Sequence, residues 1–586
     1  MGSTLEDYRA GRTPIPETML AWQITGKGME NVGENGRPQR IPVPRFADDE
    51  LLARVDANGL CFSDIKIINL GSEHPRLRGR DLKANPVIPG HEVALTIVGV
   101  GENLRDRFRV GDRFLVQADI YYKGVNYAFG YALAGGLAQY VVIGKEILEG
   151  DEGCYLLPLK PETGYAEAGL SEPWACVERA YRAAPRMGLR EGGTLCVIVA
   201  EQTAERQFSL GEVIEAGPAP RVVVLLGPSG AAEQLFQRAA QRWGAGFCAV
   251  REGEVKQLAE QHAGGAFDDV IVLGPADPRL ISAAGQCLAR DGVVNIVADE
   301  PLSAPVEVDA GRIHYENFFY IGSRGPDISE SYRRTRNAEI VPGGLLWVVG
   351  AGGPMGQMHV QRALELPQPP QLVVATDIDQ ARLDSLAERM GEIAARRNIA
   401  LRCLNPQALG EEEFSRRLRA LAPEGFDDVV LLVPSPALIC ECFRWLRARG
   451  VLNIFAGVQR GTLAPLDLSR IFLEDVRVVG TSGSSISDLQ YTLSKTESGQ
   501  LSPNLSVAAI GGIDAALDGL KAVRDGLFPG KIVIYPQVEG LPLTPLDRLG
   551  EVLPSVAAKL GPRHSWTNEA EQELLRIFIE ERNDGR

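Results

Sequence analysis

The stretch that decides the fold begins with Gly59-Leu60-Cys61-Phe62-Ser63-Asp64 and continues with Ile88-Pro89-Gly90-His91-Glu92. A third piece, Ser171-Glu172-Pro173, stands in a segment with helical spacing. Together these pieces supply one thiolate, one imidazole and two carboxylates, and zinc is commonly held by such a mixed set, with one position left open in a catalytic site. The sequence therefore predicts one zinc ion with four protein ligands, which are Cys61, His91, Glu92 and Glu172.

Each of these residues also has an ordinary structural explanation. A lone cysteine is usually a small buried hydrophobe, and an isolated His-Glu pair is usually structural. Gly90 favours the metal interpretation, because glycine lets the backbone approach the ion while two neighbouring side chains diverge from it. Ser63, two residues beyond Cys61, can place its hydroxyl beside a metal-bound alkoxide. The complete set, in this order, is far more specific than any one member.

These motifs resemble the signature of the zinc-dependent medium-chain dehydrogenases, on the branch that includes sorbitol dehydrogenase. The residues Gln117 to Tyr140 and Cys61 to Lys66 are most similar to L-sorbose-1-phosphate reductase and its relatives. The resemblance covers residues 18–190 and 221–540. It implies an α/β chain with a GroES-like β-barrel catalytic domain and Rossmann-like, doubly wound parallel-sheet domains.

Length and composition indicate a soluble globular protein of several domains. With 586 residues the chain should hold three or more domains, and its 45% hydrophobic and 23% charged residues are typical of globular proteins. No apolar run approaches the roughly 20 residues that would span a bilayer. Residues 1–7 lack the basic and apolar regions of a signal peptide. We therefore expect a cytoplasmic protein without a membrane partner.

Charge and cysteine usage narrow the partners and the metal content. The net charge of -15 argues against a general affinity for nucleic acid, although a local cluster could still hold an anionic substrate. The nine cysteines lack paired spacing except for Cys440 and Cys442, which indicates reduced thiols. Many alcohol dehydrogenases hold a second, structural zinc in a four-cysteine lobe. No cysteine lies between Cys61 and Cys154, so we expect one catalytic zinc and no structural zinc.

The pattern of residues 1–190 predicts the catalytic domain. Residues 18–60 alternate apolar and polar positions, which indicates short half-buried strands. Residues 166–184 read as a helix that brings Glu172 back to the metal, with Cys176 one turn later on the same face. Residues 511–540 resemble the part of the family's fold that returns to the barrel. Residues 191–220 contain a β-like run, Thr194–Val199, but no glycine turn follows it, so we assign a connector there, with an extra strand pair as the alternative.

The remainder contains an internal repeat. Three segments recur after 158 or 159 residues, namely Phe267–Leu273 as Phe426–Leu432, Gly292–Ile296 as Gly450–Ile454, and Tyr320–Gly325 as Val478–Gly483. An offset sustained over this length indicates a duplicated Rossmann-like domain. We assign residues 221–342 to the first copy, 343–510 to the second, and 541–586 to a C-terminal helical tail.

The second copy carries a dinucleotide-binding pattern. The run Leu345–Val349 reads as a strand and leads into Gly350-Ala351-Gly352-Gly353-Pro354-Met355-Gly356 and then a helix, while Asp377 closes the next strand. Glycines let the backbone approach a pyrophosphate at the helix N-terminus, and the acid can bind ribose hydroxyls. The expected cofactor contacts are Gly350, Gly353, Pro354, Met355, Gly356 and Asp377. A carboxylate repels a 2′-phosphate, which favours NAD over NADP.

The first copy is not equivalent. In Gly227–Glu233 a carboxylate stands where Gly356 stands in the second copy, and Arg251 takes the place of Asp377. A glutamate there would crowd the helix against the strand and oppose a pyrophosphate. We therefore predict that the first copy has lost dinucleotide binding. In the alternative interpretation, Arg251 marks a 2′-phosphate site.

Zinc and a nicotinamide together imply hydride transfer to or from an alcohol carbon. Ser63 would pass the proton. A histidine often continues the relay at the position of Lys66, so this lysine either replaces it, holds a phosphate or sugar hydroxyl, or is a solvated surface residue. His74, Arg76 and Arg78 are further candidates for an anionic group. The expected substrate is a polyol, a sugar or a sugar phosphate.

Two other functions and two assembly states stay open. An epimerase or lyase could use tightly held NAD for transient oxidation, and a non-catalytic relative could bind without reacting; the intact metal set and glycine turn favour the dehydrogenase. Relatives often dimerise by joining the edges of two Rossmann sheets, and a tandem pair could cover that edge within one chain. We therefore expect either a monomer with an internal pseudo-dimer or a homodimer.

Overall fold

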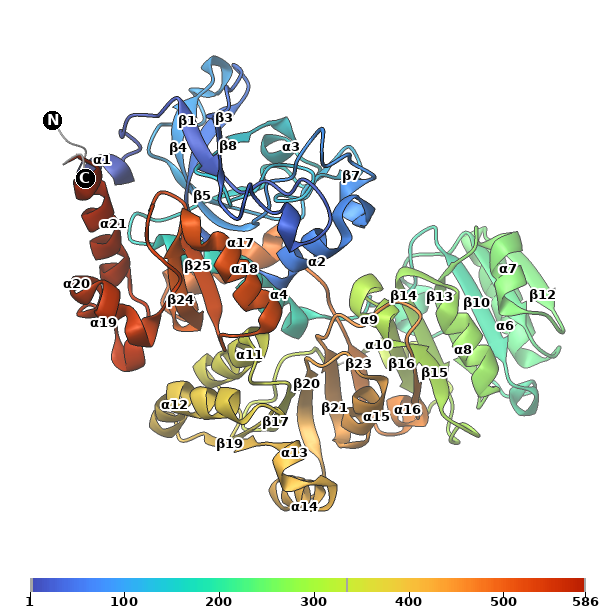
Figure 1. Ribbon diagram of the computed structural model, residues 1–586. Helices are drawn as coiled ribbons and strands as arrows, with labels where there is room; N and C mark the ends of the chain where they lie inside the picture. Colours follow the sequence, from blue (N-terminus) through green and yellow to red (C-terminus); the bar gives the residue numbers. More distant parts are fainter. Residues whose placement is uncertain (1–3, 334–335, 584–586) are drawn as a thin grey trace. The chain divides into compact units, whose positions relative to one another are not determined.

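The computed structural model describes residues 4–333 and 336–583, so the outermost ends of the predicted first and last domains, and residues 334–335 of the predicted first copy, lie outside the described residues. The chain forms two compact units. The first, here called the barrel unit, combines residues up to 178 with residues 353–358 and those from 483 onward. The second, here called the Rossmann unit, contains residues 179–352 and 359–482. Figure 1 shows the blue and red ends of the chain together in the barrel unit.

An eight-stranded sheet forms the core of the barrel unit. Its strands follow the order β26-β24-β25-β3-β4-β5-β9, and β8 also pairs with β3. The strands are β3 (Leu51–Gly59), β4 (Glu92–Val100), β5 (Arg113–Val116), β8 (Tyr140–Ile143), β9 (Leu156–Pro158), β24 (Val507–Gly512), β25 (Lys531–Tyr535) and β26 (Thr544–Pro545). The predicted return of the C-terminal chain at residue 511 is too late: the chain rejoins the barrel unit at Gly483 and joins this sheet at Val507.

Strand β3 differs from the predicted half-buried pattern. All nine of its residues are buried, although the sequence alternates polar and apolar positions. The polar residues are tolerated because Arg54 Nε donates to Asp56 Oδ1 at 2.7 Å and Thr96 on the neighbouring strand β4 donates to Asp56 Oδ2 at 2.5 Å. Paired charges can be buried where single ones cannot.

The C-terminal segment is an integral part of the barrel unit. It contains α19 (Leu549–Val552), α20 (Pro554–Ala557) and α21 (Asn568–Asn583). The buried Glu571 of α21 accepts hydrogen bonds from the backbone amides of Tyr165 at 2.6 Å and Ala166 at 2.7 Å, and from the hydroxyl of Tyr535 at 2.8 Å. Those amides begin α4 (Tyr165–Arg182), the helix that carries Glu172. The predicted helical tail thus holds the N-terminus of a helix beside the candidate site.

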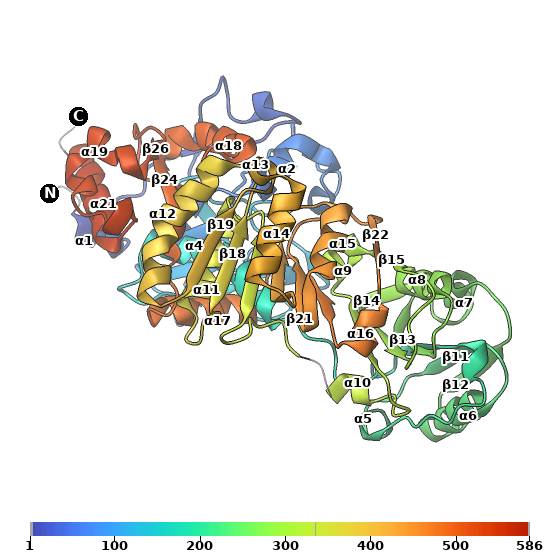
Figure 2. The same cartoon turned by 90° about the horizontal axis from the view of Figure 1, so that it is seen from below.

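Two six-stranded parallel sheets form the Rossmann unit, and they share one strand order (Figures 1 and 2). The first runs β12-β11-β10-β13-β14-β16 and the second β19-β18-β17-β20-β21-β23. The first comprises β10 (Thr194–Val199), β11 (Val222–Leu226), β12 (Gly246–Val250), β13 (Phe267–Leu273), β14 (Leu288–Val297) and β16 (Phe319–Ser323). The second comprises β17 (Leu345–Val349), β18 (Leu372–Thr376), β19 (Ala400–Leu404), β20 (Phe426–Leu431), β21 (Leu446–Ile454) and β23 (Arg477–Val479). The predicted duplication is confirmed.

Helices connect the strands in both copies. In the first copy they are α6 (Ala231–Trp243), α7 (Val255–His262) and α8 (Pro278–Gln286); in the second they are α11 (Pro354–Glu365), α12 (Gln380–Arg396), α14 (Glu411–Leu421) and α15 (Pro436–Arg444). Among the described residues, no helix has the length and apolar character needed to cross a membrane.

The connector predicted at residues 191–220 is wrong. Thr194–Val199 is β10, which pairs with β11 on one side and β13 on the other. This makes β10 the counterpart of β17, so Gly227–Glu233 follows the second strand of its sheet and Arg251 follows the third. The true counterpart of the turn at Gly350–Gly356 is the short 3-10 helix Glu201–Thr203. Because no glycine turn follows the first strand, that strand was not recognised, and Gly227–Glu233 and Arg251 were each compared with the wrong strand of the second copy; the later segments, from β13 onward, were matched correctly.

We expect Glu571→Ala to destabilise the protein by about 2–4 kcal/mol, because two buried amides at the start of α4 lose their acceptor. Urea unfolding followed by circular dichroism would measure this loss. Glu571→Gln keeps one acceptor oxygen and should lose less. Equal stability of Glu571→Ala and the unchanged protein would show that α21 does not hold α4.

Candidate functional site

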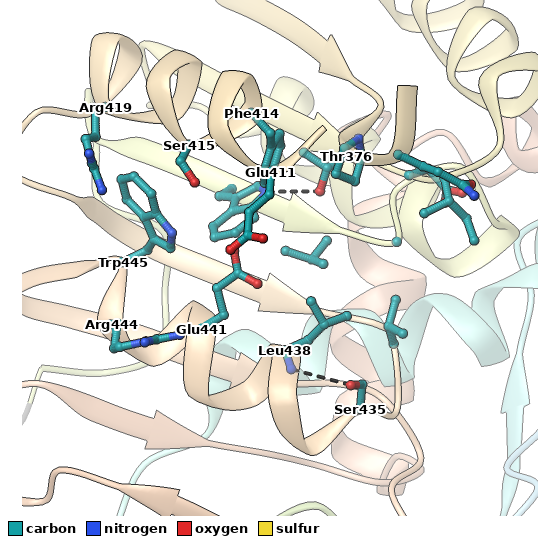
Figure 3. A pocket seen from close by; sticks show the side chains of 18 residues that line it. Thr376, Glu411, Phe414, Ser415, Arg419, Ser435, Leu438, Glu441, Arg444 and Trp445 are labelled. Atoms are coloured by element: carbon teal, nitrogen blue, oxygen red, sulfur yellow. Dashed lines mark hydrogen bonds between the residues drawn. The ribbon is translucent and has the colours of Figure 1, made fainter. Parts of the chain in front are cut away.

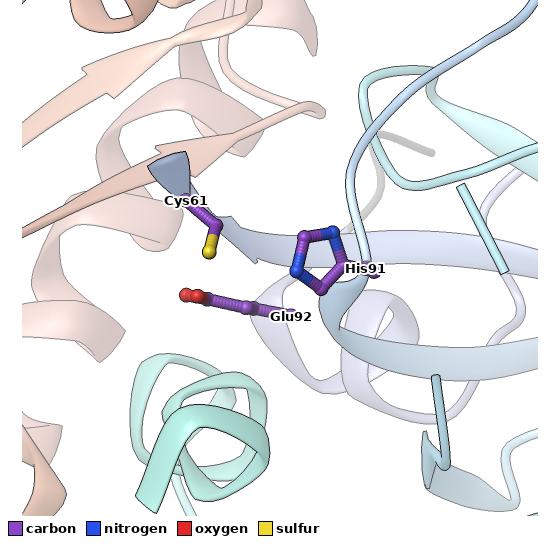
Figure 4. Close-up of side chains that lie close together, drawn as sticks. All are labelled: Cys61, His91 and Glu92. Carbon is purple, nitrogen blue, oxygen red and sulfur yellow. The ribbon is translucent and has the colours of Figure 1, made fainter. Parts of the chain in front are cut away.

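Three of the four predicted zinc ligands converge in the barrel unit. Cys61 stands at the N-cap of α2 (Phe62–Leu70), and Glu92 is the first residue of β4. One ligand atom each from Cys61, His91 and Glu92 lies within 4.8 Å of the others, and Figure 4 shows the three side chains directed toward one another. We call these residues the metal group.

The metal group fits a cation. The Oε2 atom of Glu92 is fully buried and has no hydrogen-bond partner among the described residues. A buried carboxylate oxygen without a partner is costly, and a metal ion would remove that cost. The glycine at position 59 leaves space beside Glu92 Oε2, because a Cβ on residue 59 would stand only 2.1 Å from that oxygen. Thiolate, imidazole and carboxylate together form a donor set suited to zinc.

Asp64 holds the metal group from behind, a role that the sequence reasoning missed. Its Oδ1 lies 3.4 Å from His91 Nδ1, and its two oxygens accept the backbone amides of Gly90 at 3.2 Å and Cys61 at 3.0 Å. Burial lowers the pKa of His91, but Asp64, together with Tyr131 and Cys61, raises it, and the resulting pKa lies well above its usual value. A carboxylate on the outer nitrogen of a ligand histidine fixes its orientation. The signal was present, because Asp64 occupies the third position of α2, where it completes a capping box.

Lys531 is the second residue that the sequence reasoning missed. Its buried ammonium donates to Glu92 Oε1 at 2.5 Å and to the carbonyl of Leu60 at 2.8 Å. Burial lowers the pKa of Lys531, yet the carboxylate of Glu92 raises it above the ordinary value overall. Glu92 therefore has one oxygen held by a cation of the protein and the other available to a metal. A lysine opening the apolar strand Lys531–Tyr535 was the only hint in the sequence.

Glu172 lies close by but is not one of the three converging residues. Burial raises its pKa to about 7, the positive charge of His91 opposes the shift, and Glu92 adds to it. Its helix approaches β4 closely, because a Cβ at Gly169 would be 2.8 Å from the carbonyl oxygen of Glu92. The assignment of Glu172 as fourth ligand stays a prediction.

The two residues of the predicted proton relay lie on α2. Ser63 is half-buried and its amide faces Cys61 Sγ at 3.5 Å. Lys66 is exposed one turn farther along the helix. The structure thus places Ser63 at the metal group and Lys66 at its outer rim.

A group of basic residues adjoins the metal group through Tyr131. The Tyr131 ring is 5.8 Å from the ring of His91 and 5.3 Å from that of His74, while the Arg76 guanidinium lies 4.9 Å above it. Burial lowers the pKa of His74 to about 4, and the charges of Arg76 and Lys66 add to that shift. Arg76 also pairs with Asp119 at 2.7 Å. In this acidic protein, positive charge gathers beside the candidate site.

The glycine turn of the second copy lies between β17 and α11. Gly350 has a φ of 82°, which suits glycine, and its amide bonds to the carbonyl of Thr376 at 2.8 Å. The amide of Gly352 donates to Asp377 Oδ2 at 2.9 Å. A Cβ at Gly353 would meet nothing within 4 Å. The turn is therefore fixed at its start, and Gly353 has open space beside it.

A cavity of about 1000 Å³ opens beside this turn (Figure 3). Of the predicted cofactor contacts, Gly350 and Asp377 line it, whereas Gly353, Pro354, Met355 and Gly356 are outside its lining. The remaining wall was not foreseen and includes Trp347, Glu411, Phe414, Glu441 and Trp445. Burial raises the pKa of Glu441; Arg444 opposes this shift, and Glu411 reinforces it. An apolar cleft with a few polar groups is the usual form of a cofactor site.

Known proteins share both the barrel and the length of this chain. Residues 47–149 match the alcohol dehydrogenase GroES-like domain. Mannitol-1-phosphate 5-dehydrogenase of Aliivibrio fischeri is 24% identical over 550 residues, which cover 92% of this chain and 94% of that protein. L-sorbose 1-phosphate reductase of Klebsiella pneumoniae is 28% identical over 327 residues, covering 53% and 76%. These similarities support a member of the medium-chain dehydrogenase/reductase family.

The predicted family and fold class of this dehydrogenase are confirmed. The alignment to the Aliivibrio protein covers 92% of this chain, so the aligned region runs through both Rossmann-like copies. Among solved structures, 2R,3R-butanediol dehydrogenase of Bacillus subtilis is similar with a TM-score of 0.49 and 14% identity, covering 88% of this chain and 99% of that one.

Replacing Lys531 should make the stability of the protein more sensitive to added zinc. In Lys531→Ala, Glu92 is left buried without its counter-charge, and breaking such a pair costs about 3–5 kcal/mol. A bound cation would restore the balance. We expect zinc to raise the melting temperature of Lys531→Ala more than that of the unchanged protein in differential scanning calorimetry. Lys531→Arg, which keeps the charge, serves as the control, and an equal zinc effect in all three proteins would contradict this role.

Proposed function

We propose that this dehydrogenase is a zinc- and NAD-dependent oxidoreductase. It would transfer hydride between NAD(H) and the secondary alcohol or ketone of a polyol, sugar or sugar phosphate. The convergence of Cys61, His91 and Glu92 carries the proposal, because it supplies a cation site with a free buried oxygen in a family of dehydrogenases. The glycine turn of the second copy, closed by Asp377, supplies the matching cofactor site.

Different residues of the barrel unit would bind the metal, orient its histidine ligand and transfer the proton. Cys61, His91 and Glu92 would hold zinc, with Glu172 as a fourth ligand, and the ion when bound would polarise a carbonyl or stabilise an alkoxide. Asp64 keeps the His91 ring in place. Ser63, half-buried at the start of α2, would take the proton of the substrate hydroxyl, and the exposed Lys66 at the rim would be in contact with solvent.

The residues around the glycine turn favour NAD. The Asp377 carboxylate is fixed by two backbone amides, from Gly352 at 2.9 Å and Asp379 at 3.0 Å. A fixed negative charge at the ribose accepts hydrogen bonds from its hydroxyls and repels a 2′-phosphate. The aromatic wall of the cavity, with Trp347, Phe414 and Trp445, would take the adenine end.

The basic residues beside the metal group support a phosphorylated substrate. Lys66, His74 and Arg76 lie on the side of His91 that carries Tyr131, and an arginine offers paired donors to a phosphate. The relatives from Aliivibrio and Klebsiella carry sugar phosphates in their names. Arg76 uses one nitrogen for Asp119, which leaves other guanidinium donors for a ligand.

A screen of polyols, sugars and their phosphates with NAD, followed at the absorbance of NADH, tests the proposal. Cys61→Ala should lose its zinc, measured by elemental analysis, and more than about 100-fold of the activity, since even groups that only support a ligand are worth 10–100-fold. Cys154→Ala, a half-buried cysteine elsewhere in the barrel unit, should retain both. Turnover of a sugar without net NADH formation would instead favour the epimerase or lyase.

Arg76→Gln should raise the KM for a sugar phosphate about 10–100-fold, because a charged hydrogen bond to phosphate is worth roughly 1.5–3 kcal/mol. The KM for the same sugar without phosphate should stay the same, as should kcat for both. Arg105→Gln, which removes an exposed positive charge elsewhere in the barrel unit, controls for the change in net charge. An equal effect on both substrates would show that Arg76 has only a structural role.

A further inference from the structure

The two Rossmann-like copies meet in a contact that repeats itself with the partners exchanged. Strand β15 (Val306–Asp309) of the first copy pairs antiparallel with β22 (Leu463–Leu466) of the second. Val306 pairs with Leu466, and Val308 pairs with Ala464. In this region Gly322 corresponds to Gly480, 158 residues later, so positions 306 and 308 correspond to 464 and 466. Exchanging the two copies therefore turns the pair Val306–Leu466 into the pair Val308–Ala464, and the reverse.

The helices at the contact obey the same rule. A Cβ at Gly322 of β16 would lie 2.7 Å from the Cβ of Phe472 in α16 (Ser469–Leu473). A Cβ at Gly480 would lie 3.0 Å from the Cα of His314 in α9 (Ala310–Glu316). Position 314 corresponds to 472 at the same offset. Each copy therefore contacts the other through equivalent positions: a glycine of one copy packs against a helix of the other.

Each of these helices is anchored by an equivalent arginine. In α9, Arg312 donates to the carbonyl of Leu288 at 2.6 Å and to Glu316 at 2.8 Å. In α16, Arg470 donates to the carbonyl of Leu446 at 2.7 Å and pairs with Glu474 at 2.8 Å. All three residues of one set correspond to those of the other. The two contacting surfaces are therefore equivalent parts of the duplicated domain, and both have kept the arginine that anchors the helix.

The contact is apolar and continuous with the core. One cluster of buried side chains contains Leu302 and Ile313 of the first copy together with Ile471 and Phe472 of the second. Interfaces that resemble a divided core are typical of permanent association. The contact is therefore a fixed one.

The segment that leads into each copy is held by an asparagine of the other copy. Asn453 of the second copy donates to the carbonyl of Ala180, which precedes β10 of the first, at 2.9 Å. Asn295, its counterpart in the first copy, donates to the carbonyl of Ile328, which precedes β17 of the second, at 3.0 Å. The first copy is therefore inserted into a connection that otherwise joins α4 to the second copy.

We propose that the first Rossmann-like copy, residues 194–323, is a permanent partner subunit for the second, carried within the same chain. A contact in which position i meets j and j meets i is the mark of a two-fold dimer, and here it is satisfied inside one polypeptide. Strand β23, the edge strand of the second sheet, contacts β16 of the first, and in this way an edge that could receive another chain is covered. The protein is accordingly a monomer with one nucleotide site, because Glu201–Thr203 replaces the glycine turn in the first copy.

The inserted copy also supports the cofactor-binding copy. His314 Nδ1 lies 3.2 Å from the carbonyl oxygen of Ile454, at the carboxyl end of β21. In open parallel sheets the ligand lies outside this end of the strands. His314 of the first copy therefore positions the carboxyl end of β21, where a ligand of the second copy would lie. The first copy contributes through this positioning residue and not by binding a ligand of its own.

Sedimentation equilibrium and nucleotide titration of the full chain test the proposal, and they do so whatever the substrate proves to be. We expect a single species of 63.4 kDa at micromolar concentration and one NAD bound per chain by calorimetry. A stable homodimer, or two NAD molecules per chain, would overturn the proposal.

The glycines at the contact supply a second, independent measurement. Gly480→Ala places a Cβ against the His314 backbone, and Gly322→Ala places one against Phe472. Both should lower the melting temperature by about 5 °C and give a concentration-dependent dimer as the covered edge opens. Gly391→Ala in α12, where a Cβ meets nothing within 4 Å, should leave mass and melting temperature unchanged. If the two contact variants behave like this control, the internal dimer is refuted.

Discussion

A buried ion pair between Lys531 and Glu92 ties the end of the chain to its beginning. The two residues stand 439 positions apart, and neither is more than slightly exposed. A carboxylate and an ammonium can be buried here only as a pair. The pair therefore requires β25 beside β3 and β4, and the intervening Rossmann unit must leave and return to one sheet. The metal group and the domain order follow from this constraint.

Much of the candidate site could be predicted because its signals are local. Cys61, His91, Glu92 and the turn at Gly350–Gly356 each lie in short motifs whose chemistry is visible in the sequence. Lys531 could not be found in this way, because its partner is distant and only the folded sheet joins them. The large aromatic wall of the cavity was equally hidden, since Trp347 and Trp445 come from different strands and loops.

The fold of the first copy shows how one missing signal propagates. Thr194–Val199 has the composition of a buried strand, yet the absence of a glycine turn after it led to a connector. The duplication itself was readable, because β13, β14 and β16 keep their spacing in the second copy. The strand order then shows what spacing could not: the divergence between the copies is concentrated at the first crossover, where the second has α11 and the first has only short helical turns.

The position of Lys531 also sets an order of events on the ribosome. Glu92 emerges 439 residues before its counter-charge, and at 5–20 residues per second this delay is roughly 20 to 90 seconds. The whole Rossmann unit is synthesised in that interval, while the sheet of the barrel unit still lacks β24 and β25. A metal ion captured early would supply a positive charge to Glu92 in the meantime. In a nascent chain, Glu92 therefore waits for the counter-charge of Lys531 until the Rossmann unit has been made.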